Sequence, residues 1–158
     1  MPSEILSRED RCLQFKNNLP TDEGYVQGYI KTNIYGIQNG IEAYDQDELI
    51  DVFYYGYISE DKSQVPIVFF NGGPASSSHS SWENLYKDIV ADTKQTYIMI
   101  DQRGTGCSTA YPDSSYFDLL IDFRTYRYFS SRFIIRDAEL VRTKLFGENS
   151  KWKIFGQS

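Results

Sequence analysis

Residues 65–106 read VPIVFFNGGPASSSHSSWENLYKDIVADTKQTYIMIDQRGTG, and this stretch decides the fold. It contains two short, continuous apolar runs, Val65–Phe70 and Tyr97–Ile100, which are typical of strands buried on both faces. Between them a glycine-rich loop leads into a predicted helix, which begins with a capping box formed by Ser80 and Glu83. The apolar residues of this helix recur on one face: Trp82, Leu85, Tyr86, Ile89 and Val90. The pattern predicts a strand–loop–helix–strand unit.

A second unit of the same type follows. Residues 131–146 are predicted to form a helix, which Gly147 would end. Its apolar face comprises Ile134, Ala138, Val141 and Leu145, and its solvated residues are Arg136, Asp137, Glu139 and Arg142. Lys151–Phe155 is predicted to be the last strand. Because strands alternate with helices, the chain should form an α/β fold with a mostly parallel sheet, right-handed crossover helices and these three strands as parallel neighbours.

The N-terminal part has a different pattern. Residues 1–20 are weakly patterned and form a predicted arm, either a short helix or a loose segment, before a core domain over 21–158. Strands are expected near residues 24–31 and 49–58, with a hairpin turn at Asn39-Gly40 between them. Gly56, inside the second of these strands, indicates a bulge or a close approach of another backbone.

Composition excludes several classes of protein. The 158 residues carry a formal net charge of −6 and have no basic run, which argues against nucleic acid or an anionic membrane as a partner. No apolar stretch is long enough for a membrane span, and the N-terminus lacks the apolar region of a secretory signal. The two cysteines, Cys12 and Cys107, do not form a disulfide framework in a chain of this length. We expect a soluble, cytoplasmic protein.

Three short motifs follow the three buried strands, at the ends where α/β sheets carry their functional groups. They are Asn71-Gly72-Gly73-Pro74-Ala75, Asp101-Gln102-Arg103-Gly104-Thr105-Gly106 and Gly156-Gln157-Ser158. The third is the first half of the G-x-S-x-G turn that exposes a nucleophilic serine, Ser158 here. In the first, Gly72 and Gly73 allow backbone N–H groups to approach a substrate oxyanion, although a tight turn into a helix explains the same glycines.

The motifs together resemble the proline iminopeptidase (prolyl aminopeptidase) family of α/β-hydrolase serine peptidases. The resemblance includes an Arg-Asp-Ala-Glu-x-x-Arg helix from Arg136 and a Trp-x-x-x-Gly-Gln-Ser strand from Trp152, and covers 65–158 best. Two positions depart from the family, since Asn71 and Ala75 replace its usual His and Gly. The Asn-Gly-Gly-Pro loop is also similar to that of serine carboxypeptidases, which share the fold.

The resemblance implies the N-terminal part of an α/β-hydrolase fold that ends at the nucleophile. Ser158 would attack a carbonyl of a peptide substrate, and Gly73, with Gly72, would bind the oxyanion. The remaining site residues would shape the loops around it: Asn71, Pro74, Asp101, Gln102, Arg103 and Gly104. The triad acid and histidine would follow Ser158, so these residues alone should be inactive. No metal or organic cofactor is expected. A non-peptidase esterase or amidase and an inactive truncated fragment are the alternatives.

Three further residues have simpler explanations than catalysis. His79, the single histidine, precedes the nucleophile in the chain, whereas the triad order places it afterwards, so we interpret it as a loop residue near the helix cap. Cys107 has no cationic activator nearby in sequence and is interpreted as a small residue filling a turn. Asp101 and Arg103 are expected to form a buried ion pair that orders their loop.

Overall fold

The computed structural model describes residues 6–34, 37–38, 41–42, 49–72, 76–110 and 127–156. Its central element is a five-stranded sheet with the strand order β1-β4-β6-β5-β7. The strands are β1 (Tyr25–Asn33), β4 (Leu49–Tyr57), β5 (Ile67–Phe70), β6 (Tyr97–Ile100) and β7 (Lys153–Gly156). A separate two-stranded hairpin, β2 (Ile37–Gln38) and β3 (Ile41–Glu42), flanks the predicted Asn39-Gly40 turn, which lies outside the described residues.

The sheet is mixed. β5 pairs in parallel with both β6 and β7, which confirms the prediction that these three strands are parallel neighbours. β1 and β4 pair antiparallel, and β4 is also antiparallel to β6. The expectation of a mostly parallel sheet was therefore wrong for the N-terminal half. β1 and β4 are joined without a crossover helix and so can pair antiparallel, and β4 then pairs antiparallel with β6 as well.

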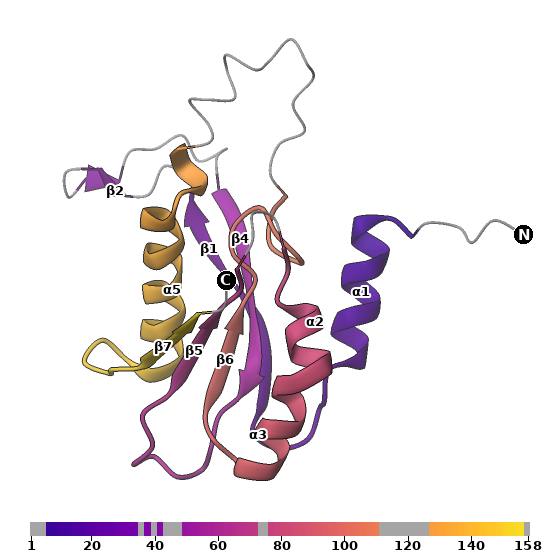
Figure 1. Ribbon diagram of the computed structural model, residues 1–158. Helices are drawn as coiled ribbons and strands as arrows, with labels where there is room; N and C mark the ends of the chain where they lie inside the picture. The colour runs from indigo at the N-terminus through magenta and orange to yellow at the C-terminus, as the bar shows by residue number, and fades with distance from the viewer. Residues whose placement is uncertain are drawn as a thin grey trace, which may run out of the picture.

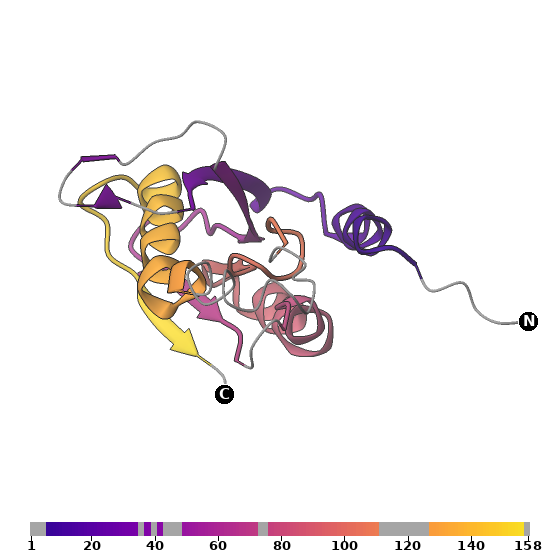
Figure 2. The same cartoon turned by 90° about the horizontal axis from the view of Figure 1, so that it is seen from above.

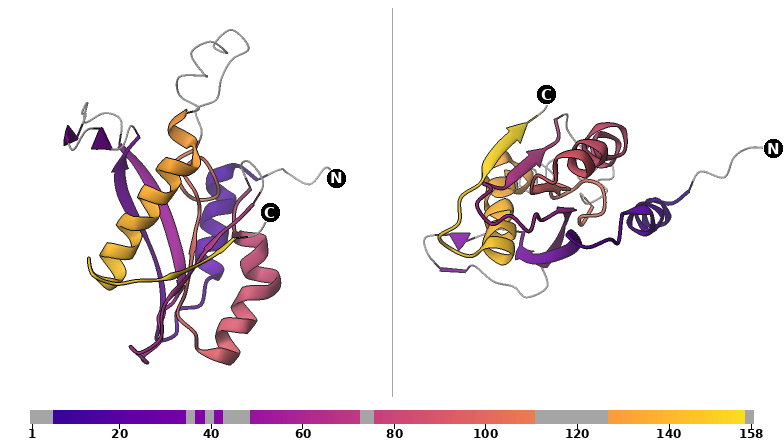
Figure 3. Two further views of the ribbon diagram at one scale, coloured as in Figure 1. Left: turned by 60° about the vertical axis from the view of Figure 1, so that its left-hand side comes forward. Right: turned by 90° about the horizontal axis from the view of Figure 1, so that it is seen from below.

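Helices cover both faces of the sheet. α5 (Ser131–Phe146) lies on one face, and α2 (His79–Ser81), the π-helical segment Trp82–Tyr86 and α3 (Lys87–Thr93) lie on the other (Figures 1 and 2). α1 (Arg8–Asn18) lies beside α2, farther from the sheet (Figure 3). A short 3-10 turn, Arg127–Phe129, precedes α5. Among the described residues, no helix is long and apolar enough to cross a membrane.

The core consists of two hydrophobic clusters, one on each face of the sheet. Successive side chains of a strand point to opposite faces, so β4 contributes Val52 and Tyr54 to one cluster and Phe53 and Tyr55 to the other. α5 closes the first cluster with buried residues that include Val141. The helix after β5 closes the second: Trp82, Tyr86 and Val90.

The helix after β5 differs from the prediction at two points. α2 begins at His79 with Ser78 as its N-cap, so the capping box of Ser80 and Glu83 does not form. Leu85 and Ile89 are exposed, although the pattern placed them on the buried face. The π-helical segment is the physical reason, because its wider turns shift residues away from the 3.6-residue period.

Residues 131–146 form α5 with the predicted bounds, and Gly147 ends it at φ +88°. Two residues predicted to be solvated are not. Asp137 is 1% exposed, and the Arg142 guanidinium is largely buried against the following turn, where its Nη1 donates to the Ser150 carbonyl at 2.7 Å. Both positions carry charge in the sequence, but each has polar partners that only the folded chain provides.

Gly56 marks a close backbone approach, one of the two roles predicted for it. A Cβ atom at this position would lie 2.0 Å from the Tyr97 carbonyl oxygen of the neighbouring strand, and the residue has φ +150°. The register of β4 against β6 is continuous through Gly56, so no bulge forms there. Glycine is required because any side chain would push the two strands apart.

The outer strand β7 is exposed along its whole length, so it is not a third buried strand, which fits its position as the last strand at the edge of the sheet. Ile154 and Phe155 are 63% and 48% exposed. Among the described strands, β7 pairs on one side only, with β5. A hydrophobic edge with unpaired backbone groups is a template for pairing with another chain.

We therefore expect the chain to self-associate in a concentration-dependent manner, and Ile154→Lys to reduce this association. A charged side chain on an edge strand opposes edge-to-edge pairing. Sedimentation velocity over a range of concentrations measures the effect. Ile135→Lys is the matched control, because Ile135 is similarly exposed but lies on α5. Equal effects of the two substitutions would contradict a role of the sheet edge.

Candidate active site

The candidate site lies at the edge of the sheet where the three parallel strands end. Phe70, the last residue of β5, pairs with Gly156, the last residue of β7. Phe69 pairs with Met99 of β6 in the same register. The chain therefore leaves all three strands side by side, and the three motifs begin at one edge. Gly73, Pro74 and Ser158 lie outside the described residues, so their assignments stay predictions.

Asn71 and Gln102 connect the loops that leave β5 and β6. The Gln102 amide Nε2 donates to the Asn71 carbonyl at 2.9 Å. The Asn71 side chain in turn donates from Nδ2 to the Ser77 carbonyl at 2.8 Å and accepts from the Ser81 hydroxyl at 3.3 Å. These bonds hold the start of the loop, including the partly buried Gly72, between β6 and the helix that follows.

Asp101 is the centre of the polar network. Its side chain is 0% exposed and accepts four hydrogen bonds. Oδ1 accepts from the backbone N–H and the hydroxyl of Ser78, at 3.2 and 2.9 Å. Oδ2 accepts from the Cys107 N–H at 2.8 Å and lies 2.6 Å from His79 Nε2. Buried charges require such partners, so this carboxylate organises the loops around it.

Gly106 makes room for that carboxylate. The residue has φ +51°, and a Cβ atom there would lie 2.1 Å from Asp101 Oδ2. The glycine in the Thr105-Gly106-Cys107 turn is thus needed both for its backbone conformation and for the close approach of the carboxylate. Gly104, also at positive φ, donates its N–H to the Thr109 carbonyl and helps to close the same turn.

His79 is part of the polar network, although the sequence suggested only a loop residue near the helix cap. It is the first residue of α2, and its imidazole pairs with Asp101 and stacks on Phe15 at 3.6 Å between ring centroids, with planes 5° apart. A histidine oriented by a buried carboxylate is an arrangement that enzymes use for proton transfer. The available signal was its position, since the single histidine follows a glycine-rich loop at the carboxyl end of a strand.

Tyr55 extends the network into the core. Its hydroxyl lies 2.7 Å from Ser78 Oγ, which itself donates to Asp101, so Tyr55 donates to Ser78. Burial, reinforced by the nearby Asp101 charge, raises the pKa of Tyr55 well above its ordinary value. The phenol therefore remains protonated and keeps its donor role.

Arg103 does not pair with Asp101, in contrast to the prediction. Its guanidinium forms a bidentate ion pair with Asp137 of α5, with Nε to Oδ2 at 2.7 Å and Nη2 to Oδ1 at 2.6 Å. Nη1 donates to the carbonyls of Ile34 and Tyr128. Sequence proximity suggested the wrong carboxylate, because the loop turns the Arg103 side chain toward α5. Asp137 lies four residues from both Phe133 and Val141 on the buried helix face, which was the available signal.

Cys107 is bonded to Cys12 in a disulfide that spans 95 residues of sequence. The two cysteines, which we did not expect to form a disulfide framework, are thus joined in a single disulfide, and the expectation that Cys107 only fills a turn is corrected. Ligand atoms of His79, Asp101 and Cys107 lie within 4.8 Å of one another, but the bonded sulfur lacks the thiolate that a metal requires.

A cleft of about 290 Å³ opens above this network. Arg8, Arg11 and Cys12 of α1 line one side of the cleft, and His79, Ser77 and residues 104–106 line the other. The single histidine thus faces a cleft at the candidate site.

Comparison with known proteins agrees with this geometry. Residues 65–158, more than half of the chain, match the α/β hydrolase fold family. A search of curated proteins gave no match. Among solved structures, the chain is similar to the hypothetical protein PA2218 from Pseudomonas aeruginosa, with a TM-score of 0.43 and 16% sequence identity. That alignment covers 99% of this chain and 40% of PA2218, so the chain spans about two fifths of that protein's length. The family match shows that this chain belongs to the α/β hydrolase fold family.

Proposed function

We propose that the chain forms the N-terminal part of a serine aminopeptidase of the proline iminopeptidase type, with Ser158 as the nucleophile. The main support is the pairing of Phe70 with Gly156, which brings the starts of the Asn-Gly-Gly-Pro and Gly-Gln-Ser motifs to the same point of the sheet edge. A nucleophile on one loop and oxyanion donors on its neighbour would then share one substrate carbonyl.

In this proposal the residues have distinct roles. Ser158 attacks the carbonyl carbon of the first peptide bond, and the N–H of Gly73, with that of Gly72, stabilises the oxyanion. Asn71 and Gln102 hold the oxyanion loop in place through the bonds described above. Asp101 and Gly104 shape the loop beside it, and Arg103 anchors that loop to α5. The proton acceptor and its orienting carboxylate would lie beyond Ser158, in the order of the fold family.

The test is turnover by the protein that carries this chain, measured with proline anilide, alanine anilide and short acyl esters. We expect hydrolysis of proline anilide, and Ser158→Ala should reduce kcat by about four to six orders of magnitude. The control is Ser63→Ala, because Ser63 is exposed on the turn before β5 and should leave turnover unchanged.

Two results would contradict the proposal. Full activity of the Ser158→Ala variant would exclude Ser158 as the nucleophile. Turnover of the acyl esters alone, lost in Ser158→Ala, would show an esterase with the same nucleophile and exclude the aminopeptidase assignment.

A further inference from the structure

We propose that the Cys12–Cys107 disulfide is a redox-sensitive latch that keeps α1 over the imidazole of His79. When the disulfide is intact, α1 forms one wall of the cleft and covers one face of the His79 imidazole, whose side chain is otherwise 20% exposed. When a dithiol reductant opens the disulfide, α1 is released and the covered face becomes accessible. The latch depends only on contacts within the described residues and does not rest on the proposed peptidase function.

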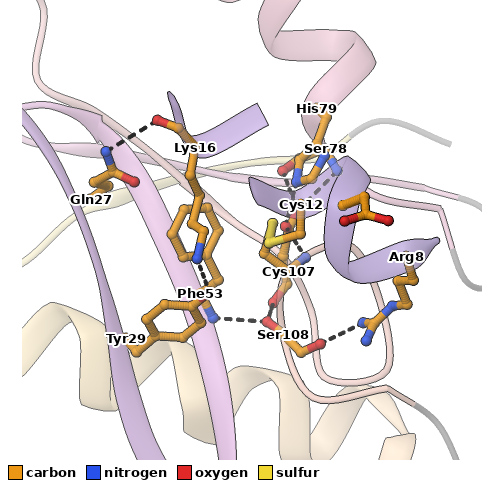
Figure 4. Close-up of a disulfide and its surroundings, with 12 residues drawn as sticks. Arg8, Cys12, Lys16, Gln27, Tyr29, Phe53, Ser78, His79, Cys107 and Ser108 are labelled. Carbon is orange, nitrogen blue, oxygen red and sulfur yellow. Dashed lines mark hydrogen bonds and ion pairs between the residues drawn. A yellow bond between two sulfur atoms is a disulfide. The ribbon is translucent and has the colours of Figure 1, made fainter. Parts of the chain in front are cut away.

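α1 has few contacts of its own with the rest of the protein. Phe15 is the only buried residue among its eleven, and Leu13 is exposed. Two of its polar contacts lie at the surface, where Lys16 Nζ donates to the Tyr29 hydroxyl at 3.3 Å and Gln27 Nε2 donates to the Lys16 carbonyl at 3.4 Å (Figure 4). A third, from the Arg8 guanidinium to the Ser108 carbonyl, is partly buried. Leu19, which caps the C-terminal end of α1, is buried in the same cluster as Phe15. Because a short helix is marginal on its own and only these two side chains anchor it, we expect the disulfide to contribute much of the docking of α1.

The one buried side chain of α1 lies directly on His79. The Phe15 ring is stacked on the imidazole and contacts Tyr55 edge-on at 5.1 Å between centroids. Phe15 is 8% exposed, so the contact removes one face of the imidazole from solvent. Undocking α1 would therefore expose the covered face of the imidazole without requiring any change in the sheet.

The disulfide acts at the loop that holds the pair. Cys107 donates its N–H to the Asp101 carboxylate, which in turn lies against His79 Nε2. Its neighbour Ser108 accepts from Arg8 of α1 through its carbonyl and from the Phe53 N–H through its hydroxyl (Figure 4). The bond between Cys12 and Cys107 thus fixes α1 to the same turn that positions Asp101.

The redox step is an ordinary thiol–disulfide exchange. One thiolate of the dithiol attacks a sulfur of the disulfide, the Sγ–Sγ bond breaks, and a mixed disulfide forms. The second thiol of the reductant then attacks the mixed disulfide, which frees the protein thiol and converts the reductant into a cyclic disulfide. Two electrons and two protons pass to Cys12 and Cys107. Oxidising compartments keep such bonds closed and cytosolic dithiols open them, so the position of α1 would follow the compartment.

The composition of the chain allows a specific test, because it has one histidine and two cysteines. The rate at which diethyl pyrocarbonate modifies the histidine is measured for the 158-residue chain, oxidised or reduced with dithiothreitol, and thiol titration confirms two free thiols. We expect reduction to increase the rate about tenfold, since local release of α1 exposes the face of the imidazole that Phe15 covers. Trp fluorescence should remain native, because Trp82 packs against Tyr55 in the core and Trp152 packs against the cluster on the other face of the sheet.

Two variants separately remove the disulfide and the contact between Phe15 and His79. In Cys12→Ser, His79 should be modified at the rate of the reduced protein, with or without the reductant. Phe15→Ala should increase the rate of His79 modification in the oxidised protein although its disulfide is intact. Leu13→Ala, the matched control on the exposed face of α1, should leave that rate unchanged. Equal rates for the oxidised and reduced chain would overturn the proposal. Loss of native Trp fluorescence in both the reduced protein and Cys12→Ser would also overturn it, because the disulfide would then hold the whole fold.

Discussion

Asp137→Ala is expected to lower the free energy of unfolding by about 3–5 kcal/mol, because it leaves the buried Arg103 guanidinium without its counter-charge. Both side chains of the pair are 1% exposed, so water cannot replace the lost partner. The loss is a large share of the 5–15 kcal/mol that stabilises a typical domain. Urea denaturation followed by circular dichroism measures it.

Two comparisons show whether the effect comes from an uncompensated charge. The double variant Arg103→Met with Asp137→Leu should recover most of the lost stability, since apolar residues of similar volume can replace a buried pair. Lys31→Ala, which removes an exposed ion pair with Asp51, should leave the denaturation midpoint unchanged. If Asp137→Ala behaves like Lys31→Ala, the pair does not stabilise the protein.

Asp101→Ala is expected to have an effect of similar size, about 3–5 kcal/mol, because it removes the shared acceptor of the buried network. The Ser78 hydroxyl and the N–H groups of Ser78 and Cys107 would lose their acceptor inside the protein. His79 would lose its carboxylate partner as well. The same denaturation experiment applies, and Trp fluorescence, to which Trp82 beside Tyr55 contributes, provides a second probe.

Gly106→Ala tests the packing around the Asp101 carboxylate by adding a side chain next to it. Its new methyl group would overlap the Asp101 carboxylate, so the variant should also be destabilised. Asp92→Ala is the control, because Asp92 is exposed near the end of α3. Stability of Asp101→Ala equal to that of the control would show that the network forms without its carboxylate.

The sequence alone determined the elements that depend on local pattern. The strands around the glycine-rich loop and the bounds of α5 follow from short-range periodicity. The sequence also marked Gly56 as a special backbone position, and the structure decided for a close approach over a bulge. Continuous apolar runs also identified β5 and β6 as neighbouring parallel strands. The same reasoning placed the three motifs at one sheet edge, because parallel strands joined by crossovers end on the same side.

Only the tertiary structure decided which residues become partners. Nothing in the sequence links Cys12 to Cys107 or Arg103 to Asp137, because these pairs are brought together by segments far apart in the chain. The solvated assignment of Asp137 failed for the same reason, since a charge on a buried helix face is tolerated only where a partner arrives from another element. His79 acquired its pairing with Asp101 and its stacking on Phe15 in this way. Local periodicity selects helices and strands, but long-range packing chooses the contacts that build the site.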